Sequence, residues 1–307
     1  MSKKDALSIA HWAANMAHRY DSLETWCAQI RRLLLQAEKR GMDMFIMPEY
    51  ISESWMHFAP ATLKPTQELA WCAEKSMQAL PLLQDAVTES GVALVAGSMP
   101  WAARGKMLNR SWVLFPNKKP AHHDKLVLTP FEMDPKSWDL NTGHTVRIFQ
   151  WKGFNMAVLI CLDVEMPALV HKLAHADIDL LLVPSMTEKP SGYHRVFDCA
   201  KARAIELMCA VSVVGAVGQS KKGRKLRDTN HSGAAVFLPC EEMFGYTGLH
   251  SHISMHGTAK GPGRILWAEN IPLGAIRTRR KGKPEVWPGP WNARKIRIET
   301  HTTARKK

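Results

Sequence analysis

The chain has 307 residues, 46% of them hydrophobic and 22% charged, a globular composition that excludes disorder, collagen or coiled coil for the whole protein. It carries 41 Lys and Arg against 28 Asp and Glu, a formal net charge of +13. Such an excess favours polyanions or acidic substrates as partners but does not bear on the fold.

The N-terminal part of the chain is predicted to form a strand, a helix and a second strand. Residues 7–12 form a short apolar strand, and apolar residues recur at three- and four-residue spacing over 22–40, which predicts a helix. Gly41 ends this helix, and residues 42–50 follow as a buried strand. Units of this kind build parallel sheet.

In the next part of the chain, the predicted helices and strands alternate less regularly. We expect a helix over residues 66–90, broken near Pro81, and then strands over 92–100 and 111–116. Residues 117–138 carry charge and proline and are predicted to form a loop.

The second half of the chain again alternates helices with strands. The expected elements are a hairpin of strands 146–151 and 155–162, a helix over 167–176, a strand over 179–185, a helix over 192–208, and strands over 210–218 and 234–239. A basic loop is expected over 220–233, and two shorter segments over 264–271 and 273–283. This pattern predicts one α/β domain over residues 1–285 and a basic C-terminal extension over residues 286–307.

The cysteines and the hydropathy indicate the compartment. Six cysteines are scattered along the chain without metal-binding spacing, which predicts reduced thiols, no metal site and a cytoplasmic protein. No run approaches the ~18 apolar residues that a membrane span needs, and polar residues interrupt any signal-peptide core at the N-terminus. We therefore expect a soluble protein with no membrane partner.

Three polar residues lie at or near the ends of predicted strands. Glu49 closes the apolar strand MFIMPE, Cys161 ends the strand NMAVLIC, and Lys125 lies in the loop between them. Taken singly, each is more often a solvated charge or a small buried hydrophobe. In open α/β sheets, however, ligands bind beyond the carboxyl ends of strands. A nucleophile, a carboxylate base and a cation are together the groups that acyl transfer requires.

Five segments of the sequence resemble the signature blocks of the nitrilase, or carbon–nitrogen hydrolase, superfamily, and they occur in the same order. They are MPEY (47–50), KLVLTPFE (125–132), ICLDVEMP (160–167), KARAIE (201–206) and HSGAAVFLP (231–239). The similarity covers nearly the whole chain, from residue 7 to about residue 280. Leu162 and Asp163 follow the cysteine, where true nitrilases usually carry Trp and Glu, so the sequence is closer to the amidase and carbamoylase branches.

The resemblance implies a four-layer α-β-β-α sandwich and a Glu–Lys–Cys triad. By matching motif positions, the catalytic residues are Glu49, Lys125 and Cys161, with Glu132 as a supporting glutamate. It also implies a homodimer or a larger homo-oligomer. The proposed chemistry needs no metal, and we predict no cofactor. Two departures from the family pattern, Ala168 and Leu207, leave the subfamily undecided without touching the triad.

These residues predict hydrolysis of a non-peptide carbon–nitrogen bond. Glu49 takes the thiol proton as Cys161 attacks, while Lys125 and the backbone N–H of Leu162 stabilise the oxyanion. A thioester forms, ammonia or an amine leaves, and Glu49 then activates water. The substrate is a small amide, a carbamoyl compound or a nitrile. Asp163 is predicted to order the turn through backbone hydrogen bonds.

The walls of the substrate pocket are harder to predict, because each candidate could equally pack in the core or at an interface. Arg195 is suited to pairing with a substrate carboxylate. The predicted substrate-binding residues are Tyr50, Trp55, Phe131, Met186, His194 and Arg195.

Two other functions remain open. A nitrile hydrolase would use the same triad. A basic nucleic-acid-binding or scaffold protein would use the runs SKKGRKLR and RTRRKGK and the basic C-terminus. These runs lack interleaved aromatics, so a solvated loop and a flexible tail explain them more simply and a nucleic-acid partner is not favoured.

Overall fold

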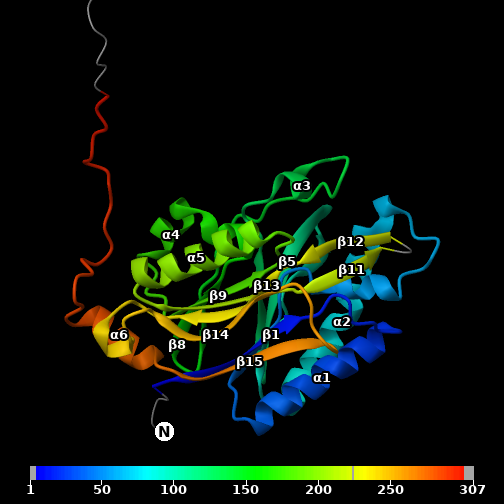
Figure 1. Ribbon diagram of the computed structural model, residues 1–307, viewed down its shortest axis with the longest axis horizontal. Coiled ribbons are helices and arrows are strands. Elements are labelled where there is room, and N and C mark those ends of the chain that lie inside the picture. Colours follow the sequence, from blue (N-terminus) through cyan, green and yellow to red (C-terminus); the bar gives the residue numbers. More distant parts are fainter. Residues whose placement is uncertain (1–4, 223–224, 301–307) are drawn as a thin grey trace, which may run out of the picture.

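Two β-sheets stacked face to face form the centre of the protein in the computed structural model, which describes residues 5–222 and 225–300 (Figure 1). The first sheet contains β1 (Leu7–Ala14), β2 (Met44–Ile46), β3 (Ala93–Val95), β4 (Met99–Ala103), β5 (Lys106–Phe115), β6 (Lys118–Asp124) and β15 (Gly263–Ile271). The second contains β7 (Phe149–Trp151), β8 (Phe154–Val158), β9 (Leu180–Ser185), β10 (Ala210–Gly215), β13 (Ser232–Phe237) and β14 (Leu249–His256).

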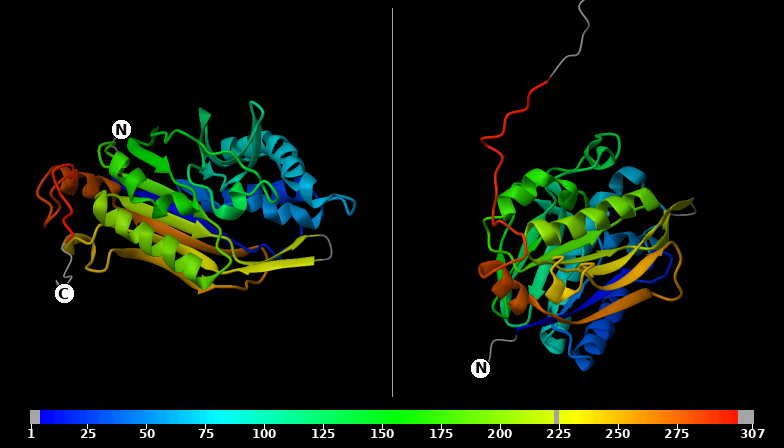
Figure 2. Two further views of the ribbon diagram at one scale, coloured as in Figure 1. Left: turned by 90° about the horizontal axis from the view of Figure 1, so that it is seen from above. Right: turned by 60° about the vertical axis from the view of Figure 1, so that its left-hand side comes forward.

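Helices cover the outer faces of both sheets, which completes four layers (Figure 2). The first sheet is covered by α1 (Leu23–Lys39) and α2 (Glu68–Ser90), and the second by α4 (Pro167–Leu173) and α5 (Pro190–Glu206). The short helix α3 (Pro130–Met133) follows β6, and α6 (Leu273–Lys281) follows β15. The protein is thus an α-β-β-α sandwich, as the resemblance implied.

The alternation of side chains along β1 shows how the layers are held. Leu7, Ile9 and Ala13 face the second sheet and join the core between the sheets, whereas Trp12 and Ala14 face α1 and α2. Successive side chains of a strand point to opposite faces, so a strand that is apolar on both faces lies between two apolar layers.

The parallel strands of each sheet bring the segments that follow them to the same edge of that sheet. In the first sheet β1, β2 and β3 are parallel neighbours, and in the second β8, β9 and β10 are. Because the carboxyl ends of parallel strands lie at the same edge, the segments that follow β2, β8 and β9 can meet there.

Several elements differ from the sequence-based expectation. β6 and the hairpin of β11 (Gly218–Lys222) and β12 (Lys225–Asn230) lie where loops were predicted, and β14 was not foreseen. β6 is an edge strand that pairs only with β5, so its polar residues and its proline are tolerated without an apolar pattern.

α2 is continuous through Pro81, where a break was expected. Pro81 lies on the exposed side of the helix, so water can satisfy the carbonyl that loses its intrahelical partner. The expected strand over 92–100 is divided into β3 and β4.

The segment over 273–283 is mostly the helix α6, and its arginines are bound in ion pairs. Arg277 and Arg280 contact Asp179, and Arg279 contacts Glu241 at 2.5 Å. This basic run is therefore a structural helix and not a solvated loop or tail. Of the other basic runs, residues 223–224 and 301–307 lie outside the described residues.

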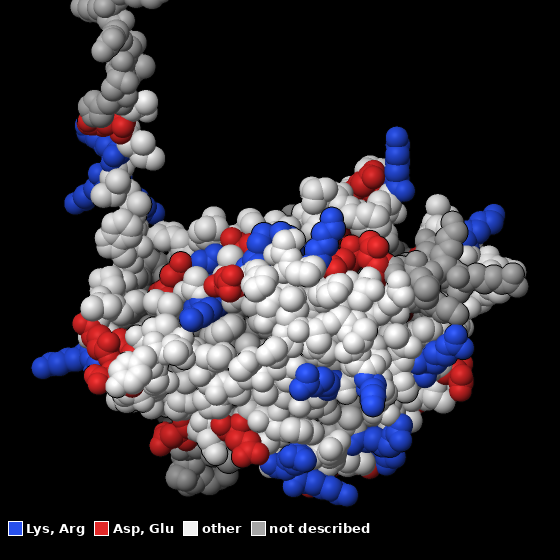
Figure 3. All heavy atoms as spheres, viewed as in Figure 1, with Lys and Arg blue, Asp and Glu red and all other residues white. Residues whose placement is uncertain are grey.

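The end of the described chain leaves the body of the protein. Residues 291–300 contain no helix or strand and extend away from the sandwich (Figure 1, red). Acidic groups lie among the basic ones on the face that Figure 3 shows. None of the described helices is long and apolar enough to cross a lipid bilayer.

Candidate active site

The candidate site residues come from four separate segments that meet at one edge of the sandwich. Glu49 lies just beyond β2, Lys125 directly follows β6, and Glu132 belongs to α3. Cys161 lies beyond β8 and opens a 3-10 turn over Cys161–Glu165. The sequence-based prediction that Glu49 and Cys161 follow strands is confirmed, whereas Lys125, which was predicted to lie in a loop, directly follows the strand β6.

A buried lysine bridges two glutamates. Lys125 Nζ lies 2.8 Å from Glu49 Oε1 and 2.8 Å from Glu132 Oε2, and it also reaches Glu132 Oε1 at 2.9 Å. All three residues are about 2% exposed. The site therefore holds one positive and two negative groups away from bulk water.

Cys161 lies beside this charged group on a sharp turn. Its backbone has a φ of 47°, a left-handed conformation that is uncommon for a residue with a side chain. Its thiol lies 3.7 Å from the carbonyl oxygen of Met186. The Glu49 carboxylate is near enough to raise the pKa of this thiol, so the turn holds the sulfur beside the glutamate.

The environment keeps the thiol protonated and the lysine charged. Burial and then the nearby Glu49 raise the pKa of Cys161 well above its usual value. Burial alone would lower the pKa of Lys125, but Glu49 and Glu132 outweigh it and raise that pKa. Burial also raises the pKa of Glu49, against the opposing effect of Lys125. For Glu132, Lys125 outweighs burial, so the pKa is lowered.

The loop that carries Glu49 is fixed by backbone contacts. Glu49 N–H donates to the carbonyl of Ser185 at 3.2 Å, which ties the first sheet to the end of β9 in the second. Gly97 packs against this loop, and a Cβ there would lie 2.0 Å from the carbonyl oxygen of Pro48. Only glycine permits this approach.

Asp163 joins the turn of the cysteine to the segment of the lysine. Its Oδ2 accepts a hydrogen bond from Ile160 N–H at 3.1 Å, which confirms its predicted role in ordering the turn. Its Oδ1 also accepts from Leu126 N–H and Val127 N–H at 3.0 and 2.8 Å, contacts that were not foreseen. His123 Nε2 lies 3.1 Å from the same carboxylate. One buried carboxylate therefore fixes two of the site's segments together.

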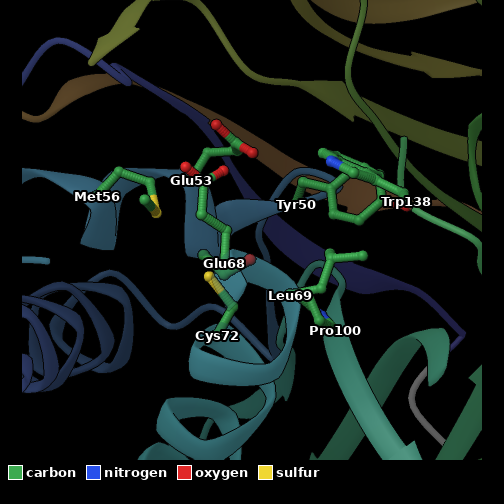
Figure 4. A pocket seen from close by; sticks show the side chains of 9 residues that line it. Tyr50, Glu53, Met56, Glu68, Leu69, Cys72, Pro100 and Trp138 are labelled. Atoms are coloured by element: carbon green, nitrogen blue, oxygen red, sulfur yellow. The ribbon is translucent and has the colours of Figure 1, made fainter. Parts of the chain in front are cut away.

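A small pocket adjoins the charged group through Tyr50 (Figure 4). The Tyr50 hydroxyl donates to Glu132 Oε1 at 2.5 Å, and its ring packs edge-on against Trp138. The pocket has a free volume of about 10 Å³, roughly the room that one water molecule needs. It is lined by Tyr50, Ser52, Glu53, Met56, Glu68, Leu69, Cys72, Pro100 and Trp138.

The predicted substrate-binding residues lie in different places: at the site, in the core and on the surface. Tyr50 and Met186 lie at the site, the latter through its backbone. Trp55 was wrongly predicted as a pocket wall. It is fully buried in the core with α1, with its ring 5.3 Å from that of Trp26, because the 3-10 turn after Tyr50 directs it inward.

The other three predicted substrate-binding residues are exposed. Phe131 is 60% exposed and packs against Trp138. The side chains of His194 and Arg195 are each 63% exposed at the start of α5, and Arg195 Nε lies 3.3 Å from Glu165. No contact joins these three side chains to the charged group among the interactions of the described residues.

Sequence reasoning missed two contacts of the site. Asn109, fully buried in β5, donates from Nδ2 to Glu49 Oε1 at 3.0 Å and to Glu132 Oε1 at 3.4 Å. The Met186 N–H donates to Glu49 Oε2 at 3.0 Å. Asn109 lies two residues before the strand predicted over 111–116, and a polar residue so close to an apolar strand was a signal that could have been used. The backbone donor has no sequence signal.

A buried thiol, a carboxylate near it and an ammonium fixed between two carboxylates lie together at the strand ends of an α-β-β-α sandwich. The protein is therefore an α-β-β-α sandwich with a Glu, a Lys and a Cys at one site. It belongs to the carbon–nitrogen hydrolase family, whose model, described as Carbon-nitrogen hydrolase, matches residues 9–253.

Curated relatives with similar sequences agree with this membership. The chain is 25% identical over 228 residues to a probable hydrolase, YhcX, of Bacillus subtilis, a match that covers 74% of this chain and 44% of the relative. It is 26% identical over 184 residues to the omega-amidase YafV of Escherichia coli K12, a match that covers 60% of this chain and 65% of the relative. The matched regions thus span less than two thirds of these curated relatives.

The fold is shared with a solved amidase from Nesterenkonia sp., with a TM-score of 0.66, 20% identity and coverage of 90% of this chain and 94% of the other. A structure of a variant of that amidase carries the acetamide moiety of fluoroacetamide attached covalently to the active-site cysteine.

Proposed function

We propose that this protein hydrolyses the carbon–nitrogen bond of a small amide through a thioester on Cys161. The observation that carries the proposal is the buried Lys125 held between Glu49 and Glu132, with the Cys161 thiol near enough to Glu49 for the carboxylate to raise its pKa. Family membership and the amidases among the similar proteins support the reaction class.

The first half-reaction forms the thioester. Glu49 removes the thiol proton as the sulfur attacks the carbonyl carbon, and the carbonyl π electrons move to oxygen. Lys125 and the backbone N–H of Leu162, near the start of a helical turn, stabilise the oxyanion. Glu49 returns the proton to the nitrogen, the C–N bond breaks, and ammonia or an amine leaves.

The second half-reaction regenerates the enzyme. Glu49 removes a proton from water, the hydroxide attacks the thioester carbon, and the C–S bond breaks as the proton passes back to the sulfur. The products are a carboxylic acid and the free thiol. Because burial raises the pKa of Cys161, the resting thiol is neutral, and Glu49 must act at the moment of attack.

Glu132 is assigned a supporting role. Its oxygens accept hydrogen bonds from the Tyr50 hydroxyl, Thr129 N–H and Lys125. With its lone pairs occupied and its pKa lowered by Lys125, it is poorly suited to accept a proton. It therefore fixes Lys125.

The activity is tested by incubating the purified chain with matched amide, N-carbamoyl and nitrile panels and measuring released ammonia. We expect release from amides and a loss of more than about a thousandfold in Cys161→Ser. The matched control is Cys209→Ser, because Cys209 is also buried but lies in the core. Equal activity in both variants, or release from nitriles alone, would contradict the amidase proposal.

Three further expectations extend this proposal. The resemblance implies a homodimer or larger homo-oligomer, which light scattering measures directly. The small-molecule amide remains the proposed partner, and the cytoplasm remains the predicted compartment. The ion-paired arginines of α6 leave less free charge for nucleic acid than the sequence indicated.

A further inference from the structure

Asn109 is a neutral side chain that, like the charged Lys125, reaches both glutamates of the site. It lies in β5, and its backbone carbonyl accepts from Lys125 N–H at 2.9 Å. Its Nδ2 contacts Oε1 of Glu49 and Oε1 of Glu132. Its other polar atom, Oδ1, is buried and accepts no hydrogen bond from any described residue.

Because Oδ1 has no partner, the orientation of the Asn109 amide is determined by its N–H contacts to the two carboxylates. An unsatisfied buried acceptor typically costs about 1–3 kcal/mol. The amide nevertheless directs its two N–H groups at the carboxylates, because hydrogen bonds to charged acceptors are roughly twice as strong as neutral ones.

The donors divide the two oxygens of Glu49 into different roles. Oε1 accepts from Lys125 Nζ and from Asn109 Nδ2, so its lone pairs are occupied. Among the backbone and amide donors of the described residues, only the Met186 N–H bonds to Oε2, which leaves a lone pair for the thiol. A carboxylate that could rotate freely would lose this distinction.

We propose that Asn109 is a positioning residue that fixes the Glu49 carboxylate so that Oε2 receives the proton of Cys161. This inference rests on the proposed function and adds a residue to its machinery. Asn109 supplies two donors without adding a charge to a cluster of one ammonium and two carboxylates, a task that an aspartate of the same shape could not perform.

Removing these donors changes the proton affinity of Glu49. The groups that face its carboxylate are Lys125, Glu132, Cys161 and Tyr50. All of them stay in place in Asn109→Ala, so the change isolates the amide. Hydrogen bonds to the charged form favour ionisation, so their loss makes Glu49 a carboxylate only at higher pH.

The test measures the rate of Cys161 alkylation by iodoacetamide between roughly pH 5 and pH 9, read by peptide mass spectrometry. In the wild type we expect the rate to rise with the ionisation of Glu49. In Asn109→Ala this rise moves upward by about one pH unit, and the rate on the acidic side falls about tenfold.

The matched control is Ser111→Ala. Ser111 is two residues along β5, also fully buried, and its hydroxyl has no hydrogen-bond partner among the described residues. Its variant should keep the wild-type profile. Asn109→Asp, which keeps the shape but replaces the amide donors with a third carboxyl group, is the second variant if Asn109→Ala does not fold, and like charge should also move its rise in rate to higher pH.

The outcomes separate this inference from the proposed function. A folded Asn109→Ala or Asn109→Asp with the wild-type profile overturns the role of Asn109 while leaving the proposed amidase untouched. A wild-type Cys161 that reacts no faster than Cys209, with no rise in rate, overturns both. A shifted profile in a protein that releases no ammonia supports the positioning role and counts against the amidase.

Discussion

Lys125 is a buried ammonium whose stability depends on its two partners. Burying an isolated charge is costly, and two carboxylates at 2.8 Å offset that cost. The same contacts hold the cation close to the thiol, so the residue serves folding and the proposed chemistry together. The free energy of unfolding should therefore respond strongly to changes at this position.

Lys125→Met should lower the free energy of unfolding by about 3–5 kcal/mol, because it leaves two carboxylates buried without a cation. The double variant Lys125→Met/Glu132→Gln should be more stable than Lys125→Met alone, because it removes one of those charges. Urea denaturation followed by circular dichroism measures both. A double variant that is less stable than the single one would contradict this account of the buried charges.

At the scale of the element, the short 3-10 turn that begins at Cys161 depends on contacts outside itself. It covers Cys161–Glu165 and is too short to be stable alone. Asp163 supplies the missing support by accepting backbone hydrogen bonds from its own turn and from the segment that follows Lys125. The nucleophile and the lysine are therefore fixed by the same carboxylate.

Asp163→Asn should lower the free energy of unfolding by about 2–3 kcal/mol, because an amide NH₂ would replace an acceptor that faces backbone donors. The alkylation rate of Cys161 should fall as well, since the turn is no longer fixed to the lysine segment. Thermal unfolding and peptide mass spectrometry measure the two effects. Asp198→Asn, at an exposed position in α5, is the control and should change neither.

At the scale of the whole molecule, the core between the two sheets contains a titratable group. His11 lies in β1 on the same face as Ile9 and Ala13, fully buried between the sheets. Burial lowers its pKa to about 3 from an ordinary 6.5. The folded protein thus keeps this ring neutral at pH values where the unfolded chain binds a proton.

This difference makes the sandwich sensitive to acid. Between pH 6.5 and about pH 3 the unfolded state binds a proton at His11 that the folded state does not, so stability falls as the pH falls. The slope from one such group is at most about 1.4 kcal/mol per pH unit. His11→Gln should reduce the loss of thermal stability on acidification, whereas His171→Gln, at an exposed site in α4, should not. If His11→Gln loses as much thermal stability in acid as the wild type, then His11 is not the source of the acid sensitivity.

Some of the protein follows directly from local patterns. The strand–helix alternation, the apolar faces and the positions of Glu49 and Cys161 beyond strands were visible because side-chain periodicity and strand ends are properties of short segments. The polar strand β6 and the hairpin of β11 and β12 carry no such pattern, so they were predicted to be loops.

The remaining features depend on which distant residues meet. The sequence by itself determined the α/β class, and its resemblance to the carbon–nitrogen hydrolases implied the sandwich and the Glu, Lys and Cys of the site, because motif order is written along the chain. Only the tertiary structure decided that Asn109 spans both glutamates, that Asp163 joins the lysine and cysteine segments, and that Trp55 packs in the core. These contacts join residues up to tens of positions apart, and their direction depends on the stacking of the two sheets, which no short segment specifies.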